Sequence, residues 1–180
     1  MDVLAGTYID RARSILVANF LKGDADDLVF IDADVGFEPE SLVRLVNTTW
    51  PIVGGIYPKK TEPPEWPVGL HPGEIWADRD GLVDVWMVPT GFLRINRAVF
   101  GQLDVPTFAD PSGQIAAYFK TEIRDGRYWG EDVEFCRLAR EAGIPIRAIA
   151  EMDFRHVAQD GRVYSGNWGQ WLREQMKEAA

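Results

Sequence analysis

The segment LVFIDADVGFEPESLVRL, residues 28–45, constrains the fold more than any other part of the chain. Its first four residues, 28–31, are all apolar, and a strand without a polar face is expected to be buried on both faces. Pro39 suits the first turn of a helix, and the apolar residues after it recur at helical spacing. The carboxylates of Asp32 and Asp34 are therefore predicted to lie where a buried strand ends.

Asp32 and Asp34 have a chemical interpretation and a structural one. In open α/β sheets, ligands bind outside the carboxyl ends of the strands. Residues two apart in extended backbone point the same way, so both carboxylates could approach one hard cation, or a cation and a ribose hydroxyl. The Asp-x-Asp pattern is also common in surface loops, where both side chains are simply solvated. The pair alone does not decide between the two.

The rest of the chain alternates between helical and strand patterns. Helices are predicted over residues 9–21 and 131–142, the second ending at Gly143, and a terminal helix begins at WGQW. Strands are predicted at PIVGGIY, in the strand–turn–strand stretch 83–97, and at IPIRAIA. The proline-rich PKKTEPPEWP cannot form regular structure and is a candidate active-site loop. The alternation indicates an α/β domain.

Composition limits the classes of partner. The 180 residues, 46% of them hydrophobic, suffice for one domain with a sizeable core. The formal charge of −9 disfavours binding to nucleic acid or to anionic membranes. Cys136 is the only cysteine, is expected to be buried, and excludes a disulfide framework. The chain shows no apolar run near 20 residues and no leader pattern, so a cytoplasmic protein without a membrane span is expected.

Four short motifs follow one another: Asp32-Ala33-Asp34, Thr90-Gly91-Phe92, Gly130-Glu131-Asp132 at a helix start, and His156 after a strand. In this order the chain resembles the GT-A glycosyltransferases, over roughly residues 6 to 160. The motifs match the metal-binding Asp-x-Asp, the glycine-containing acceptor-side turn, the x-Glu-Asp motif and the C-terminal metal-binding histidine of that family. The phrase GEDVEFCRLAREAGIPI, with the later HV, is similar to the family-2-like branch. The resemblance implies a single GT-A-like, Rossmann-related domain with a central, mostly parallel sheet flanked by helices.

The resemblance also implies a sugar nucleotide across the strand ends, with Mn²⁺ or Mg²⁺ bridging its diphosphate. Asp34 and His156 are the expected metal ligands, and Asp32 either joins them, through an outer-shell water, or binds the ribose. Few protein ligands are needed, because such cations keep waters and substrate phosphates. Without the other motifs, His156 has a simpler interpretation as a hydrogen-bonded histidine at a strand end.

The catalytic residues implied by the resemblance are Asp132 and Glu131. Asp132 would accept the proton of an acceptor hydroxyl as that oxygen attacks the anomeric carbon, while Glu131 orients the acceptor. We expect inversion, although the motifs do not separate inverting from retaining transfer. Acidic residues in the first turn of a helix also complement its dipole and cap N–H groups, which is the structural alternative.

Weaker candidates surround these motifs. Arg11 and Arg13 on the first helix could contact the diphosphate, although a solvated helix face explains them equally well. Lys59 and Lys60 on the proline-rich loop could close over phosphates. Gly91 would let a sugar approach the backbone closely. Three tryptophans offer flat faces for a sugar or simply pack at the core: Trp66, Trp76 and Trp129.

The expected domain covers residues 1–180, with a nucleotide and metal side over 1–60, an acceptor side over 61–160 and a C-terminal helix over 161–180. Only about 30 residues precede Asp32, fewer than the family uses to build its nucleobase pocket. Weak selection between UDP- and GDP-linked donors is therefore expected, and a homo-oligomer formed through the first and last helices could supply the missing wall.

The expected partners are a UDP- or GDP-linked sugar donor and an unidentified hydroxyl acceptor. A sugar-nucleotide hydrolase or a nucleotidyltransferase would use the same metal and diphosphate site without an acceptor groove. A non-catalytic module that binds a nucleotide or a carbohydrate is the third alternative.

Overall fold

The structure, a computed structural model, describes residues 8–73 and 75–178. Its helices are α1 (Ile9–Lys22), α2 (Pro39–Val46), α3 (Arg97–Phe100), α4 (Glu131–Glu141) and α5 (Trp168–Glu178). The largest sheet has six strands in the spatial order β1 (Asp27–Ile31), β6 (Phe92–Asn96), β3 (Ile52–Gly55), β11 (Ile146–Ile149), β5 (Leu82–Met87) and β4 (Gly69–Leu70). A three-stranded sheet has the order β13 (Val163–Asn167), β12 (Asp153–Val157) and β2 (Val35–Phe37). Two hairpins complete the strands, β7 (Thr107–Asp110) with β8 (Gly113–Ala116), and β9 (Glu122–Arg124) with β10 (Arg127–Trp129).

The direction of the strands corrects the expected fold class. Neighbouring strands of the six-stranded sheet are antiparallel, with the single exception of β3 and β11. The expectation of a central, mostly parallel sheet flanked by helices is wrong. The apolar pattern of a strand carries no information on its direction, which is set by partners far away in the sequence. Strand β6, for example, lies between β1 and β3 and runs opposite to both.

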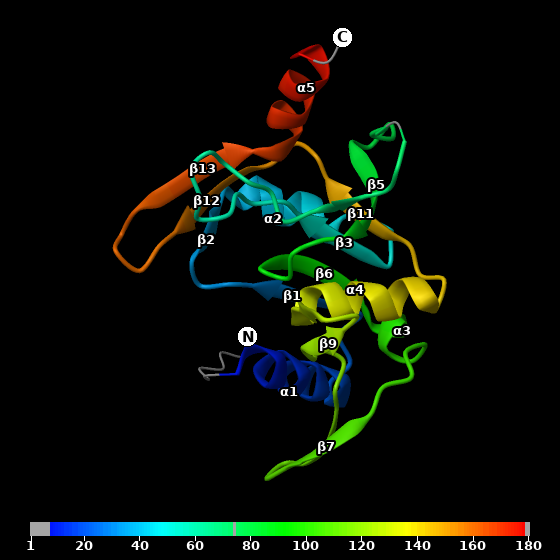
Figure 1. Ribbon diagram of the computed structural model, residues 1–180. Helices are drawn as coiled ribbons and strands as arrows, with labels where there is room; N and C mark the ends of the chain where they lie inside the picture. Colours follow the sequence, from blue (N-terminus) through cyan, green and yellow to red (C-terminus); the bar gives the residue numbers. More distant parts are fainter. Residues whose placement is uncertain (1–7, 74, 179–180) are drawn as a thin grey trace.

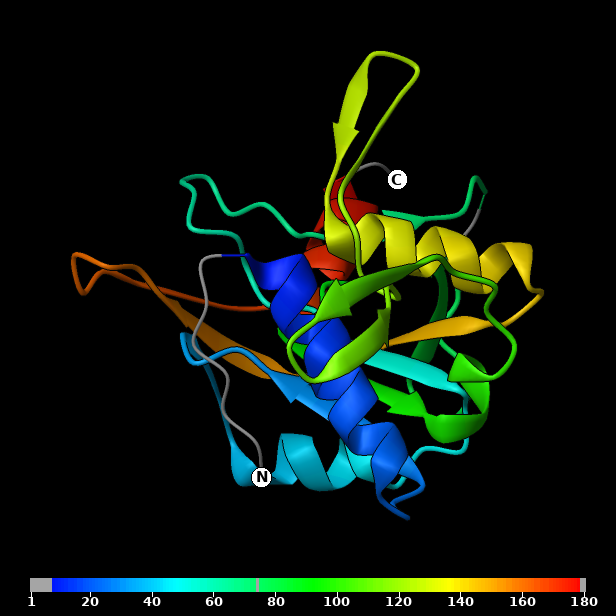
Figure 2. The same ribbon diagram turned by 90° about the horizontal axis from the view of Figure 1, so that it is seen from below.

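The six-stranded sheet lies between two layers of other elements (Figures 1 and 2), and an apolar core fills the space on each of its faces. On one face pack α1, α3 and α4, with Phe135 of α4 in the same cluster as Ile52 of β3. On the other face lie α2 and the three-stranded sheet, where Leu45 and Phe154 form a cluster with Val53. Because successive residues of a strand point to opposite faces, β3 sends Ile52 to one core and Val53 to the other.

Strand β1 lies at the edge of the sheet, which overturns the expectation of burial on both faces. Phe30 is only 5% exposed, but the next residue, Ile31, is 43% exposed. The chain then leaves the large sheet and enters the three-stranded sheet at Val35, in a short strand that the sequence did not indicate. The turn that carries Asp32 and Asp34 therefore joins two sheets, and is not followed directly by a helix.

The predicted helices α1, α2 and α4 are confirmed, as are the strands β3, β5, β6 and β11. The C-terminal helix begins at Trp168, as the WGQW pattern predicts. The domain division placed the helix over 161–180, but residues 163–167 pair with β12 as strand β13, and residues 179–180 lie outside the described part. The division of the chain into a nucleotide side and an acceptor side stays a prediction.

Two polar anchors hold α1 in place. Arg97, at the start of α3, donates to carbonyl oxygens at the end of α1, to Phe20 at 3.1 Å and to Gly23 at 3.0 Å. Both carbonyls lie at the helix end, where the Phe20 oxygen also accepts from the N–H of Gly23 at 3.1 Å, and a cation there complements the helix dipole. In the middle of α1, the fully buried Ser14 hydroxyl bonds both the carbonyl and the N–H of Phe119, at 3.1 and 3.2 Å. The orientation of α1, and of Arg13 on it, is therefore determined.

Two further expectations can be compared with the structure. Cys136 is fully buried, as predicted, and burial raises the pKa of its thiol to about 12. None of the helices described is long and apolar enough to cross a membrane.

Gly55 tests the packing between the two sheets. A Cβ added there would overlap with the Phe154 ring and lie 2.8 Å from Cδ1 of Phe92. We expect Gly55→Ala to lower the free energy of unfolding by about 1–3 kcal/mol, because the aromatic rings must move. The control is Gly101→Ala at the exposed end of α3, where the nearest atom is 3.8 Å away and the change should stay within about 0.5 kcal/mol. Equal urea-unfolding curves for the two variants would contradict this packing.

Candidate functional site

The turn between β1 and β2 is fixed by backbone hydrogen bonds at both ends. The N–H of Asp32 donates to the carbonyl of Gly91 at 3.0 Å, and the carbonyl of Asp34 accepts from the N–H of Val157 at 2.9 Å. The two carboxylates do not converge as extended backbone predicts, because residues 32–34 form a turn. Each contacts its own set of partners.

Asp34 lies between two nitrogen groups. Its Oδ2 is 2.6 Å from Nζ of Lys60 and 3.4 Å from Nε2 of His156. Burial pushes the pKa of the Asp34 carboxyl upward, but the hydrogen bond and charge of Lys60 and the charge of His156 outweigh it, so this pKa lies below its usual value. Asp34 is therefore an anion at neutral pH.

His156 is oriented by the proline-rich loop. Its Nδ1 lies 2.8 Å from the carbonyl oxygen of Pro58, and because that oxygen can only accept, Nδ1 must carry the hydrogen. In a neutral ring, Nε2 then holds a lone pair that faces the Asp34 oxygen. Two facing acceptors require a proton or a metal cation between them, and a backbone carbonyl behind the ring is a common support for a metal-binding histidine.

The fit of Asp34 and His156 to a divalent cation can be tested from their separation. Two ligands about 2.1 Å from one cation lie roughly 3.0 to 3.4 Å apart, and the observed 3.4 Å falls at the end of that range. Among residues 8–73 and 75–178, no group of three or more His, Cys, Asp or Glu side chains could hold a metal. Asp32 is thus not a third ligand beside Asp34 and His156, and waters or phosphates would complete the coordination.

Arg13 organises a second charged group. The residue is 5% exposed, and its guanidinium lies 3.1 Å from Oδ2 of Asp32 and 3.3 Å from Oε1 of Glu131. Its guanidinium carbon also lies over the ring of Phe30, 5.5 Å from the centroid. One buried cation therefore joins helix α1, the turn after β1 and the start of α4.

Glu131 and Asp132 stand at the start of α4. Burial, and next the charge of Asp132, raises the pKa of Glu131, although Arg13 opposes the shift. Burial also raises the pKa of Asp132, with a smaller contribution from the charge of Asp32. The Oδ1 of Asp132 accepts from the N–H of Val133 at 2.7 Å. Asp132 therefore also satisfies a free N–H group at the start of the helix, as the structural alternative predicts. A carboxylate with a raised pKa takes up a proton more readily.

Tyr57 connects the two charged groups and was missed in the sequence. Its hydroxyl accepts from the N–H of Gly91 at 3.2 Å, and its ring centroid lies 5.1 Å from that of His156. Burial and the charge of Asp32 raise the pKa of its phenol. A Cβ at Gly91 would lie 2.8 Å from Oδ2 of Asp32 and overlap with the Tyr57 hydroxyl, which is why only glycine fits. In the sequence, Tyr57 could have been recognised as a site residue from its place at the end of the apolar PIVGGIY strand.

Two predicted phosphate contacts lie elsewhere. The guanidinium of Arg11 is half exposed and pairs with Asp110 on the β7–β8 hairpin. Lys59 is exposed and pairs with Glu65 at 2.9 Å, while its neighbour Lys60 reaches Asp34. The structure thus brings Arg13, Lys60 and Gly91 to the carboxylates and leaves Arg11 and Lys59 outside.

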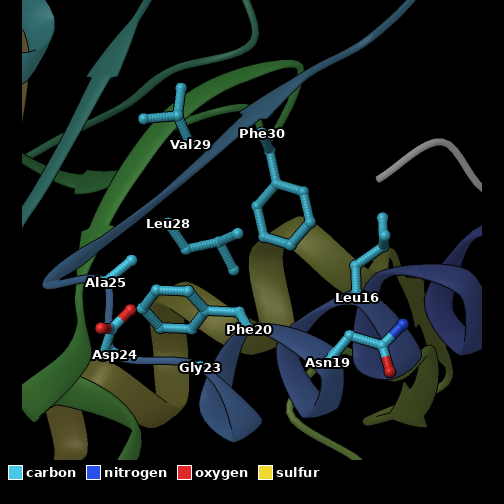
Figure 3. Close-up of a pocket in the computed structure, with 9 residues that line it drawn as sticks. All are labelled: Leu16, Asn19, Phe20, Gly23, Asp24, Ala25, Leu28, Val29 and Phe30. Atoms are coloured by element: carbon cyan, nitrogen blue, oxygen red, sulfur yellow. The ribbon is translucent and has the colours of Figure 1, made fainter. Parts of the chain in front are cut away.

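A cavity of about 390 Å³ lies between α1 and β1 (Figure 3). Phe20, Leu28 and Phe30 supply much of its apolar lining, and Asn19 and Asp24 its polar groups. Neither Arg13 nor the Asp32–Asp34 turn lines it, so this cavity is separate from the charged groups.

Comparisons with known proteins concern the fold alone. No protein-family model matches the chain, and no curated protein matches it. Among solved structures, it is similar to the crystal structure of A197 from STIV, with a TM-score of 0.58 and 20% identity. The match covers 93% of this chain and 80% of that one. At this identity the likeness supports a shared fold and leaves activity, substrates and metal binding as predictions.

The raised pKa of Asp132 has a consequence for stability. A carboxyl whose folded-state pKa exceeds its unfolded value stabilises the fold when protonated, below about pH 4, and this contribution is lost as the pH rises through the folded pKa. Asp132→Asn cannot ionise and keeps the cap, so it should be more stable than the wild type at pH 7. We expect the difference to shrink toward pH 4 in urea unfolding.

The control for this prediction is Asp104→Asn, which removes the same charge from an exposed carboxylate. Its stability should follow the wild type at every pH. A larger gain for Asp132→Asn at pH 4 than at pH 7 would contradict a buried, raised-pKa carboxyl.

Proposed function

We propose that the protein is a metal-dependent glycosyltransferase that moves a sugar from a nucleoside-diphosphate sugar to an acceptor hydroxyl. The observation that carries the proposal is the pair of Asp34 Oδ2 and His156 Nε2, which face each other at 3.4 Å while Pro58 holds the other side of the imidazole. This arrangement favours a cation, and Arg13, which contacts both Asp32 and Glu131, links the half-buried carboxylates at the start of α4 to the same turn.

Asp34 and His156 would hold Mn²⁺ or Mg²⁺. The cation would neutralise the charge that develops on the leaving diphosphate. Lys60, whose ammonium already contacts Asp34, would turn toward a phosphate oxygen when Asp34 binds the cation.

Asp132 is the proposed base. Burial raises the pKa of its carboxyl, which makes the ionised carboxylate a stronger base, and that carboxylate would take the proton from the acceptor hydroxyl as the hydroxyl oxygen bonds to the anomeric carbon. Glu131, held by Arg13 at 3.3 Å, would accept a hydrogen bond from the acceptor and orient it. Attack on the face opposite to the leaving diphosphate inverts the anomeric centre.

Nucleotide binding tests the metal half of the site. We expect a nucleoside diphosphate to bind in calorimetry only with Mn²⁺ or Mg²⁺, and Asp34→Ala to weaken binding by about tenfold or more, since it removes the only carboxylate ligand. His156→Ala should act in the same direction but less, because water can replace one neutral ligand. Asp104→Ala is the matched control on the surface. Equal affinity in excess chelator, together with loss of binding in Lys60→Gln, would show that lysine alone supplies the charge.

Transfer tests the role of Asp132. Asp132→Asn keeps size and capping but removes basicity, so the transfer rate should fall by roughly 10²- to 10⁴-fold with donor affinity little changed. Labelled donor and product analysis would measure it, and NMR of the product reads the anomeric configuration. Normal turnover in this variant would leave Asp132 as a helix cap only. Release of free sugar that no acceptor suppresses would favour the hydrolase.

A further inference from the structure

A pocket of about 310 Å³ lies along one side of α4 and is lined by basic and aromatic residues. Its charged or titratable lining consists of Arg124, Arg137, Arg140 and His71, and two tryptophans, Trp86 and Trp129, form aromatic walls. No carboxylate lines it among the residues described, although the chain has 28 acidic residues against 19 basic ones. The volume is at the lower end of small-molecule sites, roughly 300–1,000 Å³. Such a lining selects a small anion.

One buried carboxylate contacts two of the three arginines. Glu134 is fully buried in α4, with Oε1 2.9 Å from Arg124 and Oε2 2.9 Å from Nε of Arg137. At the rim, Arg137 also pairs with Glu141 and lies 4.0 Å from Glu122. These contacts fix the guanidinium planes, so little side-chain entropy is lost when a ligand binds.

Arg140 differs from the other two arginines. It is exposed, and within the described part of the chain no carboxylate lies at ion-pair distance from it. Its guanidinium carbon lies 5.8 Å from the ring centroid of Trp86, and that of Arg124 lies 5.5 Å from that of Trp129. As far as the described residues show, Arg140 therefore presents its donors to a ligand without first breaking an ion pair.

The aromatic walls add a second requirement. A tryptophan face packs against a flat or apolar ligand surface, such as the C–H face of a sugar ring. A ligand that satisfies both features carries a ring and an anionic group. Inorganic phosphate alone would use the arginines and leave the two tryptophans unused.

The pocket opens beside the proposed base. Trp129 ends the β9–β10 hairpin, which stands at the start of α4 (Figure 2). Val133, the next lining residue on the helix, is bonded through its N–H to Asp132. Val133, Arg137 and Arg140 recur at the helical spacing that places them on one face. The lining of the pocket therefore begins one residue after the proposed base along α4.

We propose that this pocket binds an anionic sugar, one that carries a carboxylate or a phosphate, as part of the acceptor. The assignment as acceptor rests on the proposed function, whereas the binding of the sugar does not. Arg140, which has no ion-pair partner among the described residues, binds the anionic group, and Trp86 and Trp129 line the space for the ring.

The test is an NMR titration of the full chain without donor and without metal. Glucuronic acid and glucose 6-phosphate are the anionic probes, and glucose, inorganic phosphate and UMP are the comparisons. We expect both anionic sugars to shift the indole N–H signals of Trp86 and Trp129, with affinity at least about tenfold above that of glucose or phosphate. Trp86→Phe and Trp129→Phe assign the two signals.

Two arginine variants test whether the anionic sugars bind in this pocket. Arg140→Gln should weaken the binding of both anionic sugars by about tenfold, since it removes a charge-assisted contact and breaks no ion pair between residues that the structure describes. Arg162→Gln, an equal loss of charge on the β12–β13 turn, should leave the affinity unchanged. If both variants weaken binding equally, the loss comes from the overall charge of the protein and not from a contact in the pocket, which would overturn the proposed site.

The remaining outcomes separate this proposal from the glycosyltransferase. Failure of both anionic sugars to bind overturns the pocket, even if a nucleoside diphosphate binds with Mn²⁺. Conversely, anionic sugars that bind while no nucleotide does support the pocket and contradict the glycosyltransferase. If UMP binds more tightly than either sugar, the pocket is a nucleotide site. If inorganic phosphate binds with the same affinity as glucose 6-phosphate, the tryptophans do not contribute to binding.

Discussion

The candidate site depends on one buried cation, the guanidinium of Arg13. Three carboxylates, Asp32, Glu131 and Asp132, come from two separate segments and would repel one another without it. Removing a guanidinium from water is costly, and the balance is favourable only when carboxylates with good geometry receive it. Because Arg13 lies on α1, the arrangement also requires that helix to dock in one orientation, which Arg97 and Ser14 enforce.

The charged groups form a series along the ends of several elements. Asp34, Lys60 and His156 make one half, and Arg13, Asp32 and Glu131 make the other. Tyr57 lies against both, with its ring beside His156 and its hydroxyl on the N–H of Gly91. Helix α4 extends the series, since its first turn carries the proposed base and its side carries the arginine–tryptophan pocket.

Local patterns predicted much of this architecture and little of its assembly. The helical spacing in α1, α2 and α4 and the apolar run of β3 are confirmed, because periodicity and helix-start residues are local properties. The parallel sheet was wrong, and β1 was placed in the interior although it is an edge strand. Both errors concern which segments pair, and an apolar run looks similar in either position. The short strand β2 was missed because three residues carry no measurable period.

The sequence by itself determined which chemical groups exist and their local spacing: the acidic pair before α2, the acidic start of α4 and the histidine of β12. Only the tertiary structure decided which of them meet. Arg11 and Arg13 are two residues apart on a helix, about 200° around its axis, so one reaches the carboxylates and the other the β7–β8 hairpin. Lys59 and Lys60 diverge in the same way on their loop. The choice within each pair follows from the face that packs on the sheet, which depends on contacts between residues distant in sequence.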